Sequence, residues 1–220
     1  MKPVKALILG ILLLVPILIF IFISVFGTHH FSLKTYYPKL DDFGKVVLNA
    51  AGDTVFQYVP YFELESHTGV TVQQSDLDES IFIASFFSPA CTDSCLKVFS
   101  QLVRVQEVFE NNPDVKLVSI GVNPLSDSLQ SVQNLAQEYQ VNSDKWFLLI
   151  GDTSEVVPLV TEGFHERYEM IGDTIAHSHR LVLVDKEKNI RGVYKGADPE
   201  DADRLILEIN VLLDEYSKRK

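Results

Sequence analysis

The pattern of hydrophobic and polar positions predicts an apolar N-terminal segment followed by an α/β domain. Residues 6–27 contain no charged side chain. As a helix with a rise of about 1.5 Å per residue, such a segment reaches roughly 33 Å, enough to cross the hydrocarbon core of a bilayer. The apolar part of a cleavable signal peptide is usually only about 7–15 residues long. The pattern therefore favours an uncleaved transmembrane helix over 6–27.

The charges around this segment predict its orientation. Lys2 and Lys5 precede it, and the positive-inside rule then places residues 1–5 in the cytoplasm and everything after the helix across the membrane. Residues 28–52 are mixed and polar, so we expect a juxtamembrane tether there and a folded domain over 53–220. The chain begins with an anchor and shows no Arg- and Ser-rich transit segment, which favours a bacterial inner membrane with the domain in the periplasm.

The domain alternates short apolar runs with segments of helical spacing. In chain order we expect a hairpin with strands at 56–64 and 70–72, a strand at 81–87, a helix at 94–109, a strand at 115–122, a helix at 129–139, a strand at 146–150, a short helix at 154–163 broken near Pro158, a hairpin with strands at 180–184 and 190–194, and a final amphipathic helix from 199 to about 217. This order predicts a mixed sheet with helices on both faces.

The chain has two cysteines, Cys91 and Cys95, and both lie between the predicted strand at 81–87 and its helix. A helix N-terminus favours the thiolate, which is the form of cysteine that attacks disulfides and binds soft metals. With a cysteine pair at this junction, the order of elements fits a thioredoxin-like fold. A purely structural disulfide is the less favoured interpretation, because a short loop removes little unfolded-state entropy.

The spacing of the cysteines leaves a disulfide and a metal site both open. Positions i and i+4 of a regular helix have Cβ atoms about 5–6 Å apart, wider than the roughly 3.5–4.5 Å of a relaxed disulfide. A loop around Cys91 could close that gap. A metal ion between two thiolates accepts the wider separation, and copper or zinc sites of this kind commonly add a nitrogen ligand.

Of the six histidines, His177 and His179 are the candidates for that nitrogen ligand. They directly precede the predicted strand at 180–184, and in a thioredoxin-like fold the loop before that strand faces the cysteines. Thioredoxins have a cis-proline there, which this sequence lacks. Alternation along an extended chain could point both rings the same way.

These features resemble the SCO/SenC family, membrane-anchored thioredoxin-like copper proteins that assist assembly of the copper centre of cytochrome c oxidase. The resemblance covers about residues 53–213. It rests on Phe86-Phe87 before Cys91-Thr92-Asp93-Ser94-Cys95, on Trp146-Phe147-Leu148-Leu149-Ile150-Gly151, on Asn123-Pro124 with Asp127, and on His177-Ser178 eight residues before Asp185. The chain departs from the family pattern at Thr92 and Leu96, which replace prolines, and at Ala176, which replaces an acid.

The resemblance implies that Cys91, Cys95 and His177 bind one copper ion. The two sulfurs would favour Cu(I), and the imidazole also suits Cu(II). It implies a metallochaperone that delivers copper to the copper-bearing subunit of cytochrome c oxidase or to another cuproprotein. His179 does not fit the family register, so its role stays open between bystander, alternative ligand and partner of a ligand.

A thiol–disulfide oxidoreductase is the alternative function. Cys91 would attack a disulfide of a partner protein and Cys95 would resolve the mixed disulfide. A peroxidase would need an arginine near the motif, and the first one after it is Arg104. We therefore expect a metal carrier more than an enzyme. The formal net charge of −11 argues against nucleic acid as a partner.

Overall fold

The computed structural model describes residues 12–22, 32–88, 93–123, 128–171 and 174–219. The chain divides into two compact units, Met1–Ser32 and Leu33–Lys220. In the first unit, residues 12–22 form a helix of exposed apolar side chains. Among the described residues, no helix combines the length and the apolar character that crossing a membrane requires.

The second unit is built on a seven-stranded mixed sheet with the spatial order β2-β1-β5-β4-β3-β8-β9. The central strands β3, β4 and β5 are parallel, and the strands on either side of them run antiparallel to their neighbours. The bounds are β1 Glu63–Ser66, β2 Thr71–Gln73, β3 Ile81–Phe87, β4 Val115–Gly121, β5 Trp146–Ile150, β8 Arg180–Val184 and β9 Ile190–Lys195. The predicted mixed sheet is confirmed.

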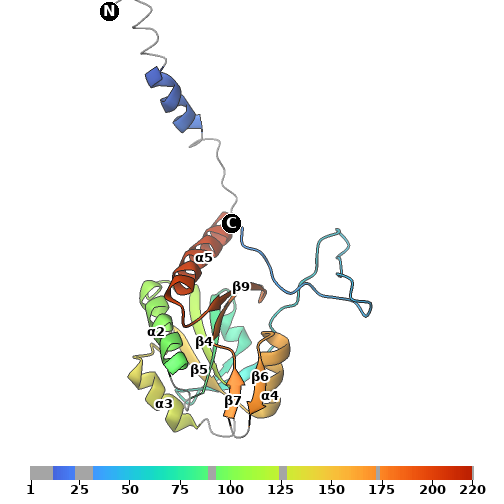
Figure 1. The fold of residues 1–220 in the computed structure, drawn as a ribbon, viewed down its shortest axis with the longest axis vertical. Coiled ribbons are helices and arrows are strands. Elements are labelled where there is room, and N and C mark those ends of the chain that lie inside the picture. The colour runs from blue at the N-terminus through green and yellow to red at the C-terminus, as the bar shows by residue number, and fades with distance from the viewer. Residues whose placement is uncertain (1–11, 23–31, 89–92, 124–127, 172–173, 220) are drawn as a thin grey trace, which may run out of the picture. The chain divides into compact units, whose positions relative to one another are not determined.

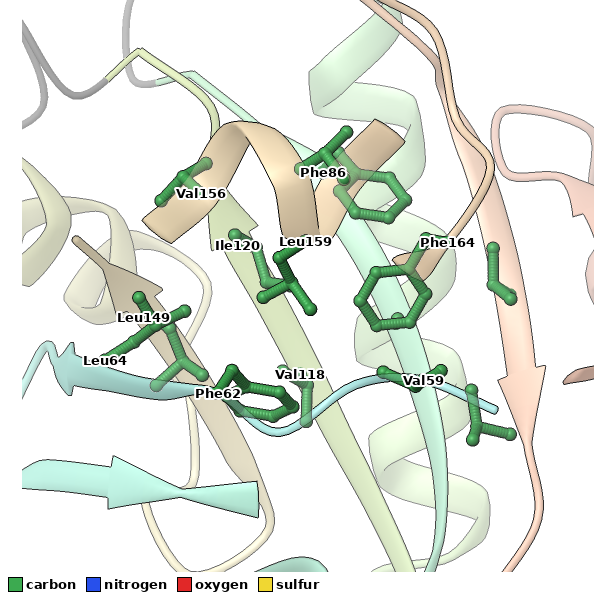
Figure 2. Close-up of a cluster of buried hydrophobic side chains, with 14 of the residues drawn as sticks. Val59, Phe62, Leu64, Phe86, Val118, Ile120, Leu149, Val156, Leu159 and Phe164 are labelled. Atoms are coloured by element: carbon green, nitrogen blue, oxygen red, sulfur yellow. The ribbon is translucent and has the colours of Figure 1, made fainter. Parts of the chain in front are cut away.

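Helices cover both faces of this sheet, as predicted. Residues of α2 (Asp93–Val108), α3 (Leu129–Glu138) and α5 (Pro199–Lys218) belong to one buried cluster. Residues of α4 (Thr153–Pro158) and of the π-helical turn η2 (Leu159–Gly163) belong to the other, shown in Figure 2. The sheet is therefore buried from both sides, and Figure 1 shows the helices flanking it.

Strand β3 contributes to both clusters. Ile81, Ile83 and Phe87 lie in the cluster with α2 and α5, whereas Phe82, Ala84 and Phe86 lie in the cluster with α4. Because successive side chains of a strand point to opposite faces, a strand covered on both sides must be apolar at nearly every position. This explains the uninterrupted apolar run that marks β3 in the sequence.

The predicted break near Pro158 is confirmed, because the α-helix α4 ends at Pro158 and the π-helical turn η2 begins at Leu159. Proline has no N–H to donate, so the α-helical hydrogen-bond pattern cannot continue unchanged through it. The chain instead widens into η2, where the N–H of Phe164 donates to the carbonyl of Leu159 at 3.0 Å. The helical path is kept, and only its hydrogen bonding changes.

Two elements were not predicted from the sequence. A two-stranded antiparallel hairpin, β6 (Tyr168–Ile171) with β7 (Thr174–His177), lies outside the main sheet. A 3-10 turn, η1 (Gln74–Leu77), follows β2. The hairpin matters for the site because its last residue is His177.

The start of the second unit is held on the sheet edge by Arg191 of β9. Its guanidinium donates to the carbonyls of Leu33 at 2.7 Å and Lys34 at 3.2 Å. The N–H of Tyr36 donates to the carbonyl of Ile190 at 2.9 Å. Residues 38–56 then pair with one another as an extended arm. Part of the segment expected to be a tether thus lies against the domain.

Candidate metal centre

The first component of the site is Cys95, in the first turn of α2. The helix begins at Asp93, directly after the junction with β3, and the side chain of Cys95 is buried, with 5% of the residue exposed. Cys91 lies outside the described residues. Cys95 is in the disulfide form in the structure. Of the two states that the cysteine spacing left open, the oxidised one is therefore present here.

The second component is a pair of histidines at the connection between β7 and β8. The Nε2 atom of His177 lies 3.8 Å from the Sγ atom of Cys95, and the Nδ1 atom of His179 lies 3.9 Å from it. The two imidazole rings meet edge to face with centroids 4.9 Å apart. Among the described residues, these three form a group whose candidate ligand atoms all lie within 4.8 Å of one another.

The backbone around each histidine is fixed by different neighbours. His177 ends β7 and pairs with Tyr168 across the β6–β7 hairpin. The carbonyl of His179 accepts a hydrogen bond from the N–H of Gly196 at 2.9 Å. A Cβ atom at Gly196 would stand only 2.7 Å from that carbonyl oxygen, so only glycine allows this approach. Both backbone positions are thus held by contacts with neighbouring elements, and both rings reach Cys95.

Hydrogen bonding and burial favour neutral, metal-ligating imidazoles. The Nδ1 atom of His177 donates to the carbonyl of Ser178 at 3.0 Å, which leaves the lone pair of Nε2 directed at the cysteine side. Burial lowers the pKa of His177, the hydrogen bond with the Ser178 backbone opposes this in part, and the neighbouring His179 adds a smaller lowering. Burial also lowers the pKa of His179. Neutral imidazole is the form that binds metals.

Glu166 lies beside the histidine loop and was missed by the sequence analysis. Its side chain is only 1% exposed, and its Oε1 atom lies 3.7 Å from Nη1 of Arg180, the residue after His179. Within the described part of the chain, Oε1 has no hydrogen-bond partner. Burial raises the pKa of this carboxyl, while Ser178 and Arg180 oppose the shift. No sequence signal marks this position, because its burial arises from tertiary packing.

The other residues singled out from the sequence lie elsewhere. Asp185 is buried at the opposite end of β8, where it forms an ion pair with Arg191 at 3.1 Å. The Nε2 atom of His67 lies 3.1 Å from Oγ of Ser143, and the ring of His165 stacks on Tyr37. Thr92, Pro124 and Asp127 lie outside the described residues.

The fold and the site define an α/β protein of the thioredoxin-like class, with a cysteine–histidine cluster that could hold a soft metal ion. The SCO1/SenC family model matches residues 51–213. The chain belongs to the SCO1/SenC family.

Individual relatives agree with this assignment. The SCO1 protein homolog of Bacillus subtilis (strain 168) is 22% identical over 152 residues, which cover 67% of this chain and 79% of that protein. A SCO1/SenC family lipoprotein from Bacillus anthracis str. Ames superposes with a TM-score of 0.66 at 19% identity, over 71% of this chain and 95% of that one. Arabidopsis thaliana ScoI, solved with copper bound, gives a TM-score of 0.58 at 25% identity, over 70% of this chain and 98% of that one.

Proposed function

We propose that this protein is a copper metallochaperone that binds one copper ion through Cys91, Cys95 and His177. The observation that carries the proposal is the convergence of Cys95 and His177 from elements 82 residues apart in the sequence, with Sγ and Nε2 at 3.8 Å. Two thiolates with an imidazole form a ligand set that suits copper. Membership of the SCO1/SenC family and the copper-bound structure of Arabidopsis ScoI support the choice of metal.

Reduction must precede copper binding. The disulfide form of Cys95 in the structure has no thiolate to offer, so two electrons and a reduced partner are required first. After reduction, the N-terminus of α2 favours the thiolate at Cys95. The neutral Nε2 atom of His177 is already directed at the same point. The site is thus arranged to accept copper as soon as the cysteines are reduced.

We further propose that the recipient is the copper-bearing subunit of cytochrome c oxidase or another cuproprotein on the same side of the membrane. Residues 6–27 would anchor the chain in a bacterial inner membrane with the domain in the periplasm, and the helix at 12–22 lies within this segment. Anchoring confines carrier and recipient to one surface and raises their effective concentration.

A thiol–disulfide oxidoreductase is the second candidate function, because a disulfide-bonded cysteine in the first turn of a helix is the group that such a protein cycles between its oxidised and reduced forms. In that case Cys91 would attack a disulfide in a partner protein and Cys95 would resolve the mixed disulfide. The two functions share their first step, because both need reduced thiols. They differ in whether metal or electrons are passed on.

The test uses the full-length chain, purified in mild detergent and fully reduced. It is titrated with Cu(I) and Cu(II) against competing chelators, and its turnover is measured in an insulin reduction assay. We expect one copper per chain, little turnover, and loss of stoichiometric binding in Cys95→Ser. Ser94→Ala, an exposed neighbour in the same turn, is the matched control. Unchanged copper content in Cys95→Ser would refute the ligand set, and turnover without metal binding would support the reductase.

A further inference from the structure

His179 lies close enough to Cys95 to bind the same metal ion as His177. We propose that His179 is a second imidazole ligand, so that it joins Cys95 and His177 in binding Cu(II). This inference rests on the proposed function and adds a ligand to it. The family register selects His177 alone, whereas the structure places Nδ1 of His179 as close to Cys95 Sγ, at 3.9 Å, as Nε2 of His177, at 3.8 Å.

The distances are close to those that a metal ion would impose. With metal–sulfur bonds of about 2.3 Å and metal–nitrogen bonds of about 2.0 Å, sulfur–nitrogen separations are about 3.5 Å in a tetrahedral site. They are about 3.0 Å between adjacent ligands of the tetragonal sites typical of Cu(II). The observed separations of 3.8 and 3.9 Å exceed both values by less than about 1 Å, and all three candidate atoms lie within 4.8 Å of one another. Reduction of the Cys95 disulfide and adjustment of the side chains would bring the three atoms onto one ion.

The backbone keeps both rings on the same side of the connection. His177 and His179 flank Ser178 in the connection between β7 and β8, and both rings lie within 4 Å of the Sγ atom of Cys95, at 3.8 and 3.9 Å. The hydrogen bond from Gly196 to the carbonyl of His179, and the absence of room for a Cβ atom at Gly196, fix the backbone of His179 at this point. The approach of His179 to Cys95 is therefore a property of the fold, and the loop needs no rearrangement.

The two oxidation states of copper should respond differently to this ligand. Cu(I) is satisfied by soft thiolates, whereas Cu(II) takes four ligands and accepts imidazole nitrogen readily. Loss of His179 should weaken Cu(II) binding at least about tenfold, because loss of even an outer partner of a ligand costs roughly 10–100-fold. The affinity for Cu(I) should change by less than about threefold, because both thiolates remain.

The experiment counts the nitrogen ligands directly. The full-length, reduced wild-type chain is loaded with Cu(II), and pulsed electron paramagnetic resonance measures the couplings from imidazole nitrogen. We expect two coupled imidazoles in the wild type and one in His179→Ala. His165→Ala should retain two, because His165 stacks on Tyr37 outside the cluster. Chelator competition then gives the Cu(I) and Cu(II) affinities of each variant.

The possible outcomes distinguish failure of the role of His179 from failure of the proposed function. One coupled imidazole in a wild-type chain that binds copper would overturn the role of His179 and leave the proposed function standing. Absence of copper binding in both oxidation states would remove the proposed function and this inference together. The count is made on the wild type itself, so a folding defect in His179→Ala, detected by circular dichroism, would not prevent a decision.

Discussion

Asp185→Ala tests whether Asp185, eight residues after His177, stabilises the fold. The Asp185 residue is 2% exposed, and one carboxylate oxygen lies 3.1 Å from Nη1 of Arg191. The other accepts the N–H of Asn189 at 2.8 Å, which closes the turn between β8 and β9. The substitution therefore removes a buried ion pair and a turn hydrogen bond at once.

The expected loss follows from what Arg191 retains. Truncating one partner of a buried ion pair costs about 3–5 kcal/mol, because the other charge is left buried without its partner. Here Arg191 keeps the carboxylate of Glu215 at 3.1 Å and the carbonyls of Leu33 and Lys34. Burial also raises the pKa of Asp185, so desolvation already opposes its charge. Both facts place the loss at the lower end of the range, about 3 kcal/mol.

The assay is urea unfolding followed by the fluorescence of Trp146, the single and fully buried tryptophan of the chain. Asp214→Ala is the matched control, because Asp214 pairs with Lys218 and both side chains are more than half exposed. Loss of that pair should cost less than about 0.5 kcal/mol. Folded Asp185→Ala should bind copper like the wild type. A free energy of unfolding no lower than that of Asp214→Ala would refute the buried-network account.

Two further predictions concern stability away from the site. Burial lowers the pKa of His67 from its ordinary 6.5, offset in part by the Leu148 backbone, so below about pH 6.5 the unfolded chain binds more protons than the folded one. The free energy of unfolding should therefore fall as the pH is lowered from that value, and it should fall less in His67→Gln. Urea unfolding at several pH values measures this. An equal fall in the wild type and in His67→Gln would contradict the prediction. Phe164→Ala should lower the free energy of unfolding by about 3–5 kcal/mol in the same assay, because Phe164 is fully buried and its ring meets that of Phe86 edge to face with centroids 5.4 Å apart (Figure 2). A loss below about 1 kcal/mol would contradict this and would show that the neighbouring side chains collapse into the cavity.

The central strands could be predicted from the sequence because their signal is local. Strands β3, β4 and β5 are short apolar runs, and their burial from two sides makes almost every position apolar. The start of α3 is fixed by Ser128, whose Oγ atom accepts the N–H of Ser131 at 3.2 Å. The β6–β7 hairpin was missed because it is short, lies outside the main sheet and has no clear alternation of apolar positions.

The sequence predicts which types of residue form the site, but only part of how they are brought together. Cys95 and the pair His177 and His179 were identified from residue type and from their places before a helix and a strand, and the family resemblance then selected His177. His179 was left open, because its position depends on the contact between its carbonyl and Gly196, 17 residues further along. Glu166 was missed for a similar reason, because its burial depends on contacts between segments that are distant in the sequence. Contacts between distant segments leave no periodic trace in a single sequence.

Strand β8 runs between the cysteine–histidine cluster and the point where the chain enters the domain. His179 precedes the strand and Asp185 follows it, about 20 Å apart at roughly 3.3 Å per residue. Arg191 holds Leu33 and Lys34 at the Asp185 end, so the incoming chain joins the domain far from the cysteine–histidine cluster. Under the proposed function, a recipient protein could therefore cover the cluster without colliding with this entry point. Changes of length in the chain before Leu33 should leave the cluster itself unchanged.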